Sequence, residues 1–454
     1  NRTTFEIVIP IEAQRLIMKN SRKSALLILN RVLNEGAFLN EELNILNDEN
    51  IDIKDKNLIS KLTKGVLKNK LLLDHIIRKH SKIRLKKIHS VILIILEMGA
   101  YQILFTDKVP DYSSINESVN LAKEFGNRGS TGFVNALLRN ISRNKEDILK
   151  SDFYLKELKD RSTADYLSIK YSHPLFFVDA LLKNHDEKFV EELLRKNNEE
   201  APFDIRVNTS KISVDEFMKE LEKEGYQWEK TKISKYALRI KNPQGIFNTK
   251  FYKEGYFYVQ DEGSILVSEI SDVKECKDIL DLCAAPGGKS INLSLLADSS
   301  DIISCDISDY KVNLIRENIK RLDLQNIHPR KNDATKLKDK FVNKFDFVLV
   351  DAPCSGFGLY RRKPEIRYNR EYNDIKSLQK IQLQILENAL KYLKPKGQLT
   401  YSTCTLSEEE NEFVVNNFIN DEFEIIKTDG KDFKRYYPNV DDTDGFTICR
   451  IKRK

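Results

Sequence analysis

The sequence is poor in residues that mark several large classes of protein. Its 454 residues include six cysteines and six histidines, and the cysteines form no C-x-x-C pair. We therefore expect neither a zinc site nor a disulfide framework. The longest apolar run, Val91–Leu96, stops at Glu97, whereas a membrane span needs about 18 apolar residues. We expect no metal, no membrane segment, no signal peptide and a cytoplasmic protein.

A large excess of one charge sign is also absent. Lys and Arg number 75 against 69 Asp and Glu, which gives a formal net charge of +6. Affinity for nucleic acid must therefore come from local basic patches. The length is sufficient for two or three domains, each with its own core.

The most informative stretch runs from Ile279 to Ser290 and reads ILDLCAAPGGKS. An apolar run ending at Asp281 predicts a buried strand, and the glycine pair permits a sharp turn close to a ligand before the next helix. A second strand ends about 25 residues later at Asp306, whose carboxylate could hold a ribose hydroxyl. This spacing indicates a nucleoside cofactor, although a glycine pair alone would equally suit an ordinary turn of an α/β protein.

From Val259 onward, predicted strands alternate with helices as in a doubly wound parallel sheet. The third strand ends near Asp333, the fourth spans residues 345–351, and the fifth spans residues 398–402. Ligands of open α/β sheets bind outside the carboxyl ends of the strands. We therefore expect one crevice lined by the acidic and thiol side chains that follow these strands: Asp281, Asp306, Asp333, Asp351, Cys354 and Cys404.

A thiol beside a nucleoside-type pocket suits methyl transfer from S-adenosylmethionine to C5 of cytosine. A thiolate that adds to C6 makes C5 nucleophilic, and loss of the C5 proton with expulsion of the thiol restores the ring. The scheme needs an attacking cysteine, a carboxylate that contacts the base and a group that assists elimination. Cys404, Asp351 and Cys354 can fill these roles, but the residues alone do not decide which cysteine attacks.

Residues 1–150 have the apolar pattern of an all-helical domain. We expect helices over residues 21–34, 59–80, 84–105 and 118–125, the last opened by a capping box at Ser114 and Glu117, and another from Phe133. The lysines at positions 61, 64, 68 and 70 suit either RNA binding or a solvated face. The histidines at positions 75, 80 and 89 are expected at the surface or in helix caps.

Residues 151–255 begin with helices and change character near residue 204. A strand at 204–208, a helix at 214–224, a strand at 236–241 and an aromatic-rich strand at 251–260 predict a small α+β module. Basic residues surround Tyr236, which suits RNA backbone and base stacking. Burial of the aromatic residues in a small core explains the same pattern.

Several motifs resemble known families. Val109–Val119 followed by Gly132–Arg139 resembles the RNA-binding fold of the antitermination factor NusB. Asp351–Gly356, which reads DAPCSG, and Tyr401–Thr405, which reads YSTCT, resemble the joint signature of RNA cytosine-C5 methyltransferases. Nearly the whole chain resembles the bacterial 16S rRNA methyltransferase family RsmB, also called Sun or Fmu, because further motifs occur in the same order: Ala285–Lys289, Glu410–Glu412, Val259–Asp261 and Asp444–Phe446.

The resemblance implies an all-α NusB-like domain at 1–150, a helical linker with a small α+β RNA-binding module at 151–255, and a Rossmann-like α/β methyltransferase domain at 256–454. It implies that Cys404 is the nucleophile and that Cys354 aids product release, so that Asp351 keeps the role of the carboxylate that contacts the base. It also implies an S-adenosylmethionine pocket formed by Cys283, Ala284, Ala285, Pro286, Gly287, Gly288, Lys289, Asp306, Asp333 and Asp351.

The implied substrate is 16S ribosomal RNA, naked or early in assembly, because the target base must leave its stack to reach the crevice. We expect the protein to act as a monomer. A tRNA cytosine-C5 methyltransferase and a non-catalytic RNA-binding assembly or antitermination factor are the alternatives. Residues 361–364, which read RRKP, predict either a phosphate clamp or a solvated loop. Ser290 and Lys311 stand where the family often has Thr and Arg.

Overall fold

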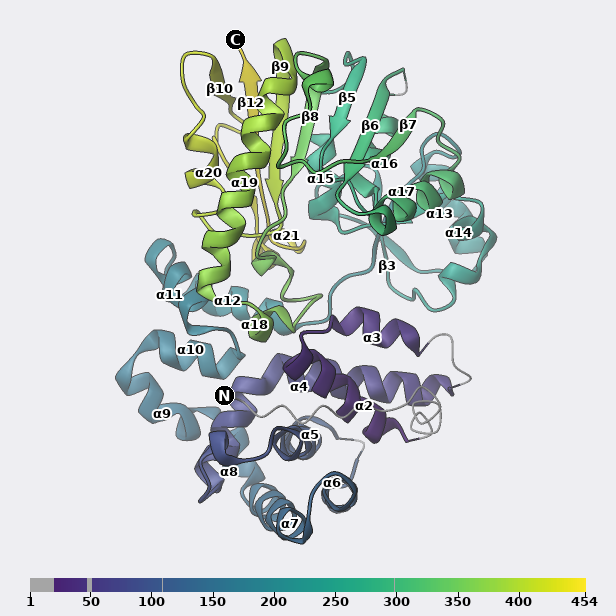
Figure 1. Ribbon diagram of the computed structural model, residues 1–454. Coiled ribbons are helices and arrows are strands. Elements are labelled where there is room, and N and C mark those ends of the chain that lie inside the picture. Colours follow the sequence, from purple (N-terminus) through teal and green to yellow (C-terminus); the bar gives the residue numbers. More distant parts are fainter. Residues whose placement is uncertain (1–19, 47–50, 108, 298) are drawn as a thin grey trace. The chain divides into compact units, whose positions relative to one another are not determined.

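The computed structural model describes residues 20–46, 51–107, 109–297 and 299–454. The chain forms two compact units, one of Asn1–Asn198 with Lys363–Asn369 and the other of Glu199–Arg362 with Arg370–Lys454 (Figure 1). The chain therefore passes between the units three times. The expected division into three domains at residues 150 and 255 stays a prediction.

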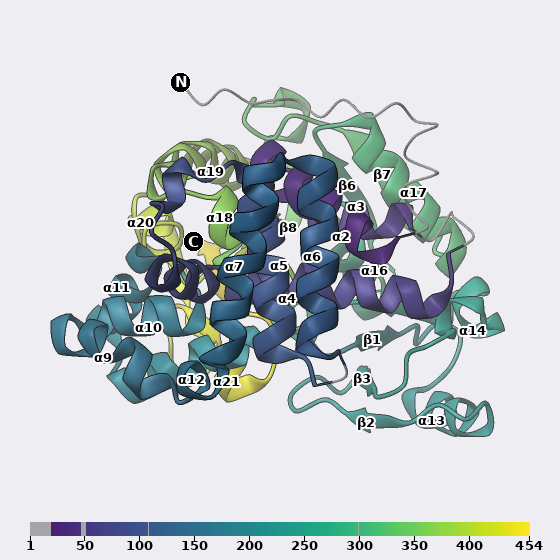
Figure 2. The ribbon, with the colours of Figure 1, turned by 90° about the horizontal axis from the view of Figure 1, so that it is seen from below.

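The described part of the first unit is helical. Helix α5 (Ser90–Phe105) lies at its centre, where it contacts α2, α4, α6 and α7 (Figure 2). It is buried on nearly every side because its residues are mostly apolar. Its only charged residue, Glu97, pairs with Lys70 Nζ at 2.6 Å. The other elements of this unit are α2 (Ser21–Asn30), η1 (Arg31–Glu35), α3 (Leu39–Ile45), α4 (Ile53–His80), η2 (Leu85–Lys87), α6 (Asp111–Phe125), α7 (Arg128–Arg143), α8 (Lys145–Leu149), α9 (Ser151–Arg161), α10 (Thr163–Tyr171), α11 (Leu175–Asn184), α12 (Glu187–Asn198) and α18 (Ile366–Asn369).

Two predictions for this unit are wrong. Helix α6 begins at Asp111, so Ser114 does not cap it, and the Ser118 hydroxyl donates to the Ser114 carbonyl at 2.8 Å inside the helix. Serine hydroxyls within a helix often donate to the carbonyl four residues earlier. A serine followed three residues later by a glutamate therefore does not by itself mark the start of a helix. His75 is buried, and burial lowers the pKa of its imidazole.

The second unit begins with a small α+β module. Strands β1 (Asp204–Val207), β2 (Trp228–Lys230), β3 (Ala237–Ile240) and β4 (Phe257–Val259) form an antiparallel sheet in the order β2-β3-β1-β4. The predicted strand at 251–260 is wrong in its first half, where Lys250–Lys253 form helix α14. Phe217, Phe251 and Phe257 lie in the core of this module, which favours burial over base stacking for these rings.

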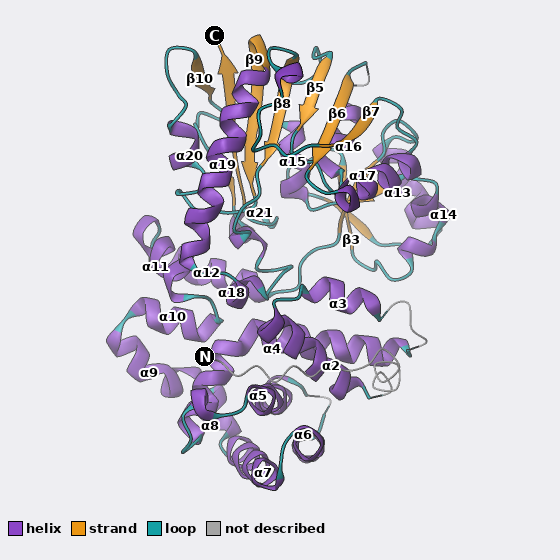
Figure 3. Cartoon of the chain, in the orientation of Figure 1, coloured by secondary structure: helices purple, strands orange, loops and turns teal. Residues whose placement is uncertain are grey.

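The larger sheet of this unit has the order β10-β12-β9-β8-β5-β6-β7 (Figure 3). Strands β5 to β9 are mutually parallel, whereas β12 is antiparallel to β9, β10 and β11. The doubly wound sheet is thus present with an antiparallel edge. Its strands are β5 (Asp278–Asp281), β6 (Asp301–Asp306), β7 (Ile327–Lys331), β8 (Phe345–Asp351), β9 (Leu393–Thr403), β10 (Phe423–Ile426), β11 (Lys434–Tyr436) and β12 (Phe446–Arg453).

Helices cover both faces of this sheet because residues along each central strand alternate between two cores. In β8, Val348 and Val350 join the core that contains α19 (Tyr372–Tyr392), while Phe347 and Leu349 join the core beneath α15, α16 and α17. The remaining elements are α13 (Val214–Lys223), η3 (Ile246–Asn248), α14 (Lys250–Lys253), α15 (Glu262–Glu269), α16 (Gly288–Leu296), α17 (Asp309–Leu322), η4 (Asp339–Phe341), η5 (Phe357–Leu359), α20 (Glu412–Asn416) and α21 (Pro438–Asp441).

The strand order reverses direction between β5 and β8. From β5 the chain proceeds to β6 and β7 on one side and then returns to β8 and β9 on the other. Such a switch point leaves a crevice outside the carboxyl ends of the two central strands. The motifs that follow β5, β8 and β9 therefore meet at one edge of the sheet.

Candidate active site

Two thiols meet at the carboxyl ends of β8 and β9. The register of these parallel strands places Asp351 opposite Ser402, so the loops that follow carry Cys354 and Cys404 side by side. Their sulfur atoms lie 3.2 Å apart, a hydrogen-bonding distance, and both cysteines are free thiols that are half-buried. The hydrogen bond between Cys354 and Cys404, together with burial, raises the pKa of Cys354 well above its usual value. Cys354 therefore keeps its proton at neutral pH.

Asp351 is fixed beside the thiols by two contacts. One oxygen accepts from Lys289 Nζ at 2.7 Å, and the other accepts from the Ser402 hydroxyl at 2.8 Å. Lys289 comes from the turn after β5, so this ion pair joins the two sides of the switch point. The Asp351 carboxylate is thus held by residues that follow β5 and lie in β9.

Glu410 holds the loop that carries Cys354, a role that the sequence did not reveal. The carboxylate of Glu410 is buried and accepts from the backbone N–H of Ser355 at 2.8 Å and from the Ser355 hydroxyl at 2.5 Å. Gln382 donates to Glu410 at 3.0 Å and to the Pro353 carbonyl at 2.9 Å. Both residues flanking Cys354 are therefore anchored. The only signal for Glu410 in the sequence was its place in a family motif.

Asn411 holds the loop that carries Cys404. Its side chain accepts from the Thr403 hydroxyl at 2.7 Å and donates to the Ser407 carbonyl at 2.7 Å. The Thr405 carbonyl on the same loop accepts from the Thr447 hydroxyl at 2.8 Å. Adjacent residues, Glu410 and Asn411, thus fix the two cysteine loops separately.

The turn from Cys283 to Lys289 has the shape of a backbone cradle. Asp306 accepts from the backbone N–H of Ala285 at 3.1 Å, and the Ala284 N–H donates to the Cys305 carbonyl at 2.8 Å. Gly287 has a φ of +109°, and a Cβ on Gly288 would lie 2.8 Å from the Tyr258 ring. Larger residues at either glycine are therefore strained or clash. The Pro286 carbonyl also accepts from Asn318 at 3.0 Å, so the turn is held from outside.

The other acidic residues of the predicted crevice differ in their environments. Asp281 is fully buried at the end of β5, which raises its pKa to about 7; its Oδ2 accepts from Ser290 at 2.6 Å, and its Oδ1 has no partner among the described residues. Asp333 follows β7 and accepts from the Thr335 hydroxyl at 2.6 Å, a bond that lowers its pKa. Lys311 lies 3.4 Å from Asp306.

The remaining cysteines have no reactive setting. Burial raises the pKa of Cys283 well above its usual value and raises those of Cys276 and Cys305 to about 11 and about 12. Cys449 is buried in β12, and its pKa is also raised. These thiols stay protonated, and Cys305 and Cys449 are buried core residues.

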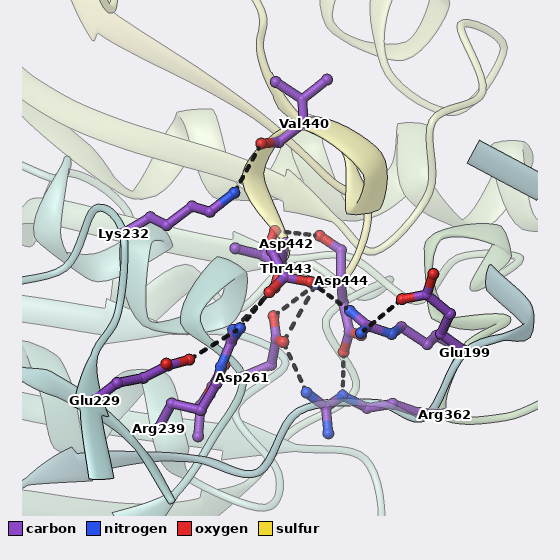
Figure 4. A network of polar contacts seen from close by, with 12 residues as sticks. Glu199, Glu229, Lys232, Arg239, Asp261, Arg362, Val440, Asp442, Thr443 and Asp444 are labelled. Carbon is purple, nitrogen blue, oxygen red and sulfur yellow. Dashed lines mark hydrogen bonds and ion pairs between the residues drawn. The ribbon is translucent and has the colours of Figure 1, made fainter. Parts of the chain in front are cut away.

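The arginines at positions 361 and 362 are neither a phosphate clamp nor a solvated pair, so both expectations for this loop are wrong. Arg362 donates to Asp444 at 2.5 Å and to Asp261 at 2.8 Å. Arg361 is buried and donates to Asp442, which also pairs with Arg239. Figure 4 shows this network, which joins the small module, the loop after β8 and the start of β12. Carboxylates distant in the sequence neutralise these guanidinium groups.

The network is adjacent to the cysteine site through a close backbone contact. The Asp444 N–H donates to Asp261, and the next residue, Gly445, donates to the Gly358 carbonyl at 2.9 Å. Gly358 in turn donates to the Cys404 carbonyl at 2.9 Å. A Cβ on Gly358 would lie 1.9 Å from the Gly445 carbonyl oxygen, so no larger residue fits without movement.

The described residues lack two further features. They contain no group of three or more His, Cys, Asp or Glu side chains placed to hold a metal ion. In the same part of the chain, none of the helices combines the length and the apolar character needed to cross a membrane.

A tight backbone turn at a switch point, beside a carboxylate and two adjacent thiols, is the arrangement expected of a methyltransferase-type α/β domain. Three family models match the chain: "16S rRNA methyltransferase RsmB/F" over residues 269–452, the NusB family over 19–143, and the ferredoxin-like domain of RsmF/B-like methyltransferases over 173–246. A probable ribosomal RNA small subunit methyltransferase B of Bacillus subtilis (strain 168) is 32% identical over 428 residues, covering 90% of this chain and 93% of its own.

Another relative and two solved structures are also similar to this chain. The ribosomal RNA small subunit methyltransferase B of Photorhabdus laumondii is 30% identical and covers 96% of this chain and 99% of its own. The crystal structure of PH0851 superposes with a TM-score of 0.76 at 23% identity over 98% of this chain and 99% of that one. A methyltransferase homolog from Pyrococcus horikoshii gives 0.58 at 28% identity over 64% and 99%. The chain belongs to the 16S rRNA methyltransferase RsmB/F family, and the predicted fold class is confirmed.

Proposed function

We propose that the protein transfers a methyl group from S-adenosylmethionine to C5 of a cytosine in 16S ribosomal RNA, with Cys404 as the nucleophile. The observation that carries this proposal is the pair of thiols 3.2 Å apart at the switch-point crevice, with Asp351 fixed on the adjoining strand. The family supports the RNA substrate, since its named members in several bacteria are ribosomal RNA small subunit methyltransferases.

The residues of the turn after β5 fit S-adenosylmethionine. Gly287 and Gly288 let the turn pack tightly against Ile315 and Tyr258, and Asp281 Oδ1 is a buried oxygen without a partner among the described residues. The backbone from Cys283 to Lys289 would hold the cofactor, and the carboxylates of Asp306 and Asp333 would accept hydrogen bonds from its nucleoside. When bound there, S-adenosylmethionine supplies the electrophilic methyl group.

The chain's own residues account for the remaining chemistry. The Cys404 thiolate forms a bond to C6 of cytosine, which makes C5 nucleophilic, and Asp351 contacts the polar edge of the base. After methylation the C5 proton must leave as the C6–sulfur bond breaks. The protonated Cys354 gives its proton to the departing Cys404 sulfur, and the resulting Cys354 thiolate takes the proton from C5. One proton is then lost to solvent, which regenerates the Cys404 thiolate.

The test is a denaturing gel of Cys354→Ala, Cys404→Ala and the double variant, each incubated with S-adenosylmethionine and a naked 16S rRNA transcript. We expect Cys354→Ala to accumulate a covalent protein–RNA band because elimination is slowed. Cys404→Ala should give neither a band nor 5-methylcytosine. A tRNA transcript run in parallel tests the alternative substrate.

The other outcomes are equally informative. A band from Cys404→Ala instead would make Cys354 the nucleophile. Methylation that persists in the double variant would show that the reaction needs no covalent adduct. A wild-type protein that methylates tRNA and leaves the 16S transcript unmodified would refute the proposed substrate.

A further inference from the structure

The first unit contains a basic segment at residues 78–87, at the end of α4 and through η2. This segment reads RKHSKIRLKK, with six Lys and Arg and no Asp or Glu. Its six charges equal the formal net charge of +6 of the entire chain. Because the whole molecule has no strong basic field, a local excess of this size is where attraction to a polyanion is concentrated.

All six cationic side chains of the basic segment are exposed. Lys79 pairs with Glu157 at 2.7 Å. Among the residues that the structure describes, no carboxylate pairs with the four that follow α4, which are Lys82, Arg84, Lys86 and Lys87. Their charges are therefore available to an external anion.

The end of α4 does not account for this charge. A helix C-terminus favours cations only within its last turn, and α4 ends at His80, so the effect reaches Arg78 and Lys79 alone. The cations from Lys82 to Lys87 lie beyond the helix. The C-terminus of α4 therefore does not stabilise the charges of these four residues.

The backbone of the basic segment is nonetheless ordered. The Ser81 hydroxyl accepts from the Ile83 N–H at 3.0 Å and donates to the Ile83 carbonyl at 2.8 Å. The Lys87 N–H donates to the Arg84 carbonyl at 2.8 Å, and Leu85 and Ile88 pack against the helical core. The cations are therefore presented on a preformed backbone, which lowers the entropy cost of binding.

Two helix N-termini lie next to the basic segment in the fold. Helix α5 starts at Ser90, directly after the segment, and a Cβ on Gly126 would lie 2.9 Å from Ile92 Cδ1 in the first turn of α5. Gly126 is the C-cap of α6 and is followed by Asn127, the N-cap of α7, whose first residue is the exposed Arg128. Helix N-termini carry partial positive charge and favour phosphate.

The lysine face expected from the sequence is a weaker candidate. Lys70 pairs with Asp74 and with the buried Glu97, and Lys68 donates to the Asn198 carbonyl at 3.2 Å. Lys61 and Lys64 stay exposed on α4. They form a pair of exposed cations on the same unit, and they serve as the natural control.

We propose that the basic segment is the surface on which the helical unit binds the phosphate backbone of the substrate RNA. The proposal rests on the proposed function for the identity of the RNA. It assigns the contact to backbone phosphates, because lysine and arginine side chains on a turn supply charge and carry no base-reading pattern.

The experiment measures binding of the full chain to a naked 16S rRNA transcript over a range of salt concentrations. The variant Lys86→Glu/Lys87→Glu is compared with Lys61→Glu/Lys64→Glu, which changes the charge by the same amount on exposed residues of the same unit. We expect the first variant to weaken binding about tenfold and to reduce the salt slope by roughly 1 to 2. The control should bind within about twofold of the wild type, as solvated surface charges do.

Thermal unfolding and S-adenosylmethionine calorimetry of both variants check that fold and cofactor site are intact. Acetylation of lysines in the wild-type protein, with and without RNA, gives an independent measurement: RNA should protect Lys82, Lys86 and Lys87 and leave Lys61 and Lys64 reactive. Equal losses in the two variants, or protection of Lys61 and Lys64 alone, would overturn the proposal. A wild-type protein that binds the transcript without methylating it would refute the proposed function and leave this surface intact.

Discussion

Glu410 and Asn411 are neighbours in the chain, yet each side chain fixes a different cysteine loop. Glu410 accepts from the backbone and hydroxyl of Ser355, the residue after Cys354, whereas Asn411 bonds the backbone around Cys404. A sulfur–sulfur distance of 3.2 Å depends on both loops. At the scale of residues, then, the site is positioned by groups that do not touch the substrate base in our mechanism.

Glu410→Ala should lower the methylation kcat by about 10²-fold, because displacing a reacting group by roughly 1 Å costs that much. Binding of S-adenosylmethionine, measured by calorimetry, should stay within about twofold, since the cradle after β5 has no bond to Glu410. The control is Glu409→Ala, the preceding residue, whose carboxylate contacts Ser407 and Tyr372. If cofactor affinity fell together with kcat, Glu410 would be supporting the whole domain and not the Cys354 loop.

Asp281 should make the stability of the cofactor-free protein fall as the pH rises. Burial raises its pKa to about 7, while in the unfolded chain it titrates near the ordinary value for Asp, about 3.9. Between these values the folded state holds a proton that unfolding releases, so the free energy of unfolding decreases with pH by at most roughly 1.4 kcal/mol per pH unit. Above about pH 7 this contribution is constant.

The measurement is a series of urea unfolding curves between the two pKa values for the wild type and for Asp281→Asn. Asparagine cannot ionise and can still accept from Ser290, so the variant should lose this part of the pH dependence. Identical pH profiles for the two proteins would mean that Asp281 is not the group responsible.

At the scale of elements, the strands of the large sheet were the most predictable feature. Buried parallel strands are continuous apolar runs, and β5, β6 and β8 each end in an aspartate that marks the carboxyl edge. The sequence could not reveal the partners of Arg362, because Asp261 and Asp444 lie about a hundred residues before and eighty residues after it. A pair of adjacent arginines looks the same in a sequence whether it binds phosphate or a distant carboxylate.

Arg362→Ala should destabilise the second unit by about 3–5 kcal/mol, because it leaves the buried carboxylates of Asp261 and Asp444 without their cation. The free energy of unfolding from urea titration measures this effect. Arg316→Ala, which removes an exposed arginine that donates to Asn313, should change it by less than about 0.5 kcal/mol. Adding Asp444→Asn to Arg362→Ala should recover part of the loss, and a double variant as unstable as the sum of two separate losses would contradict the pairing.

At the scale of the whole molecule, the course of the chain was the least predictable feature. Residues 363–369 follow the Cys354 loop in the sequence but belong to the helical unit. Arg367 donates to the carbonyls of Lys68, Ser172 and Asn197, and the Tyr368 hydroxyl donates to the Leu67 carbonyl at 2.6 Å. Each contact spans 170 to 301 residues, so no local pattern could indicate that this short segment completes another unit.

Arg367 satisfies carbonyls near the ends of α10 and α12, where a helix has none of its own donors left. Arg367→Ala should therefore destabilise the helical unit, whereas Arg362→Ala, five residues earlier in the sequence, should destabilise the second unit. Hydrogen exchange of the full chain, read by mass spectrometry, distinguishes the two: Arg367→Ala should speed exchange in residues 163–198 and leave β8 and β9 unchanged. Arg370→Ala, three residues later and in the second unit, is the control. Faster exchange of β8 and β9 in Arg367→Ala would contradict this expectation, because it would show that residues 363–369 stabilise the sheet of the second unit.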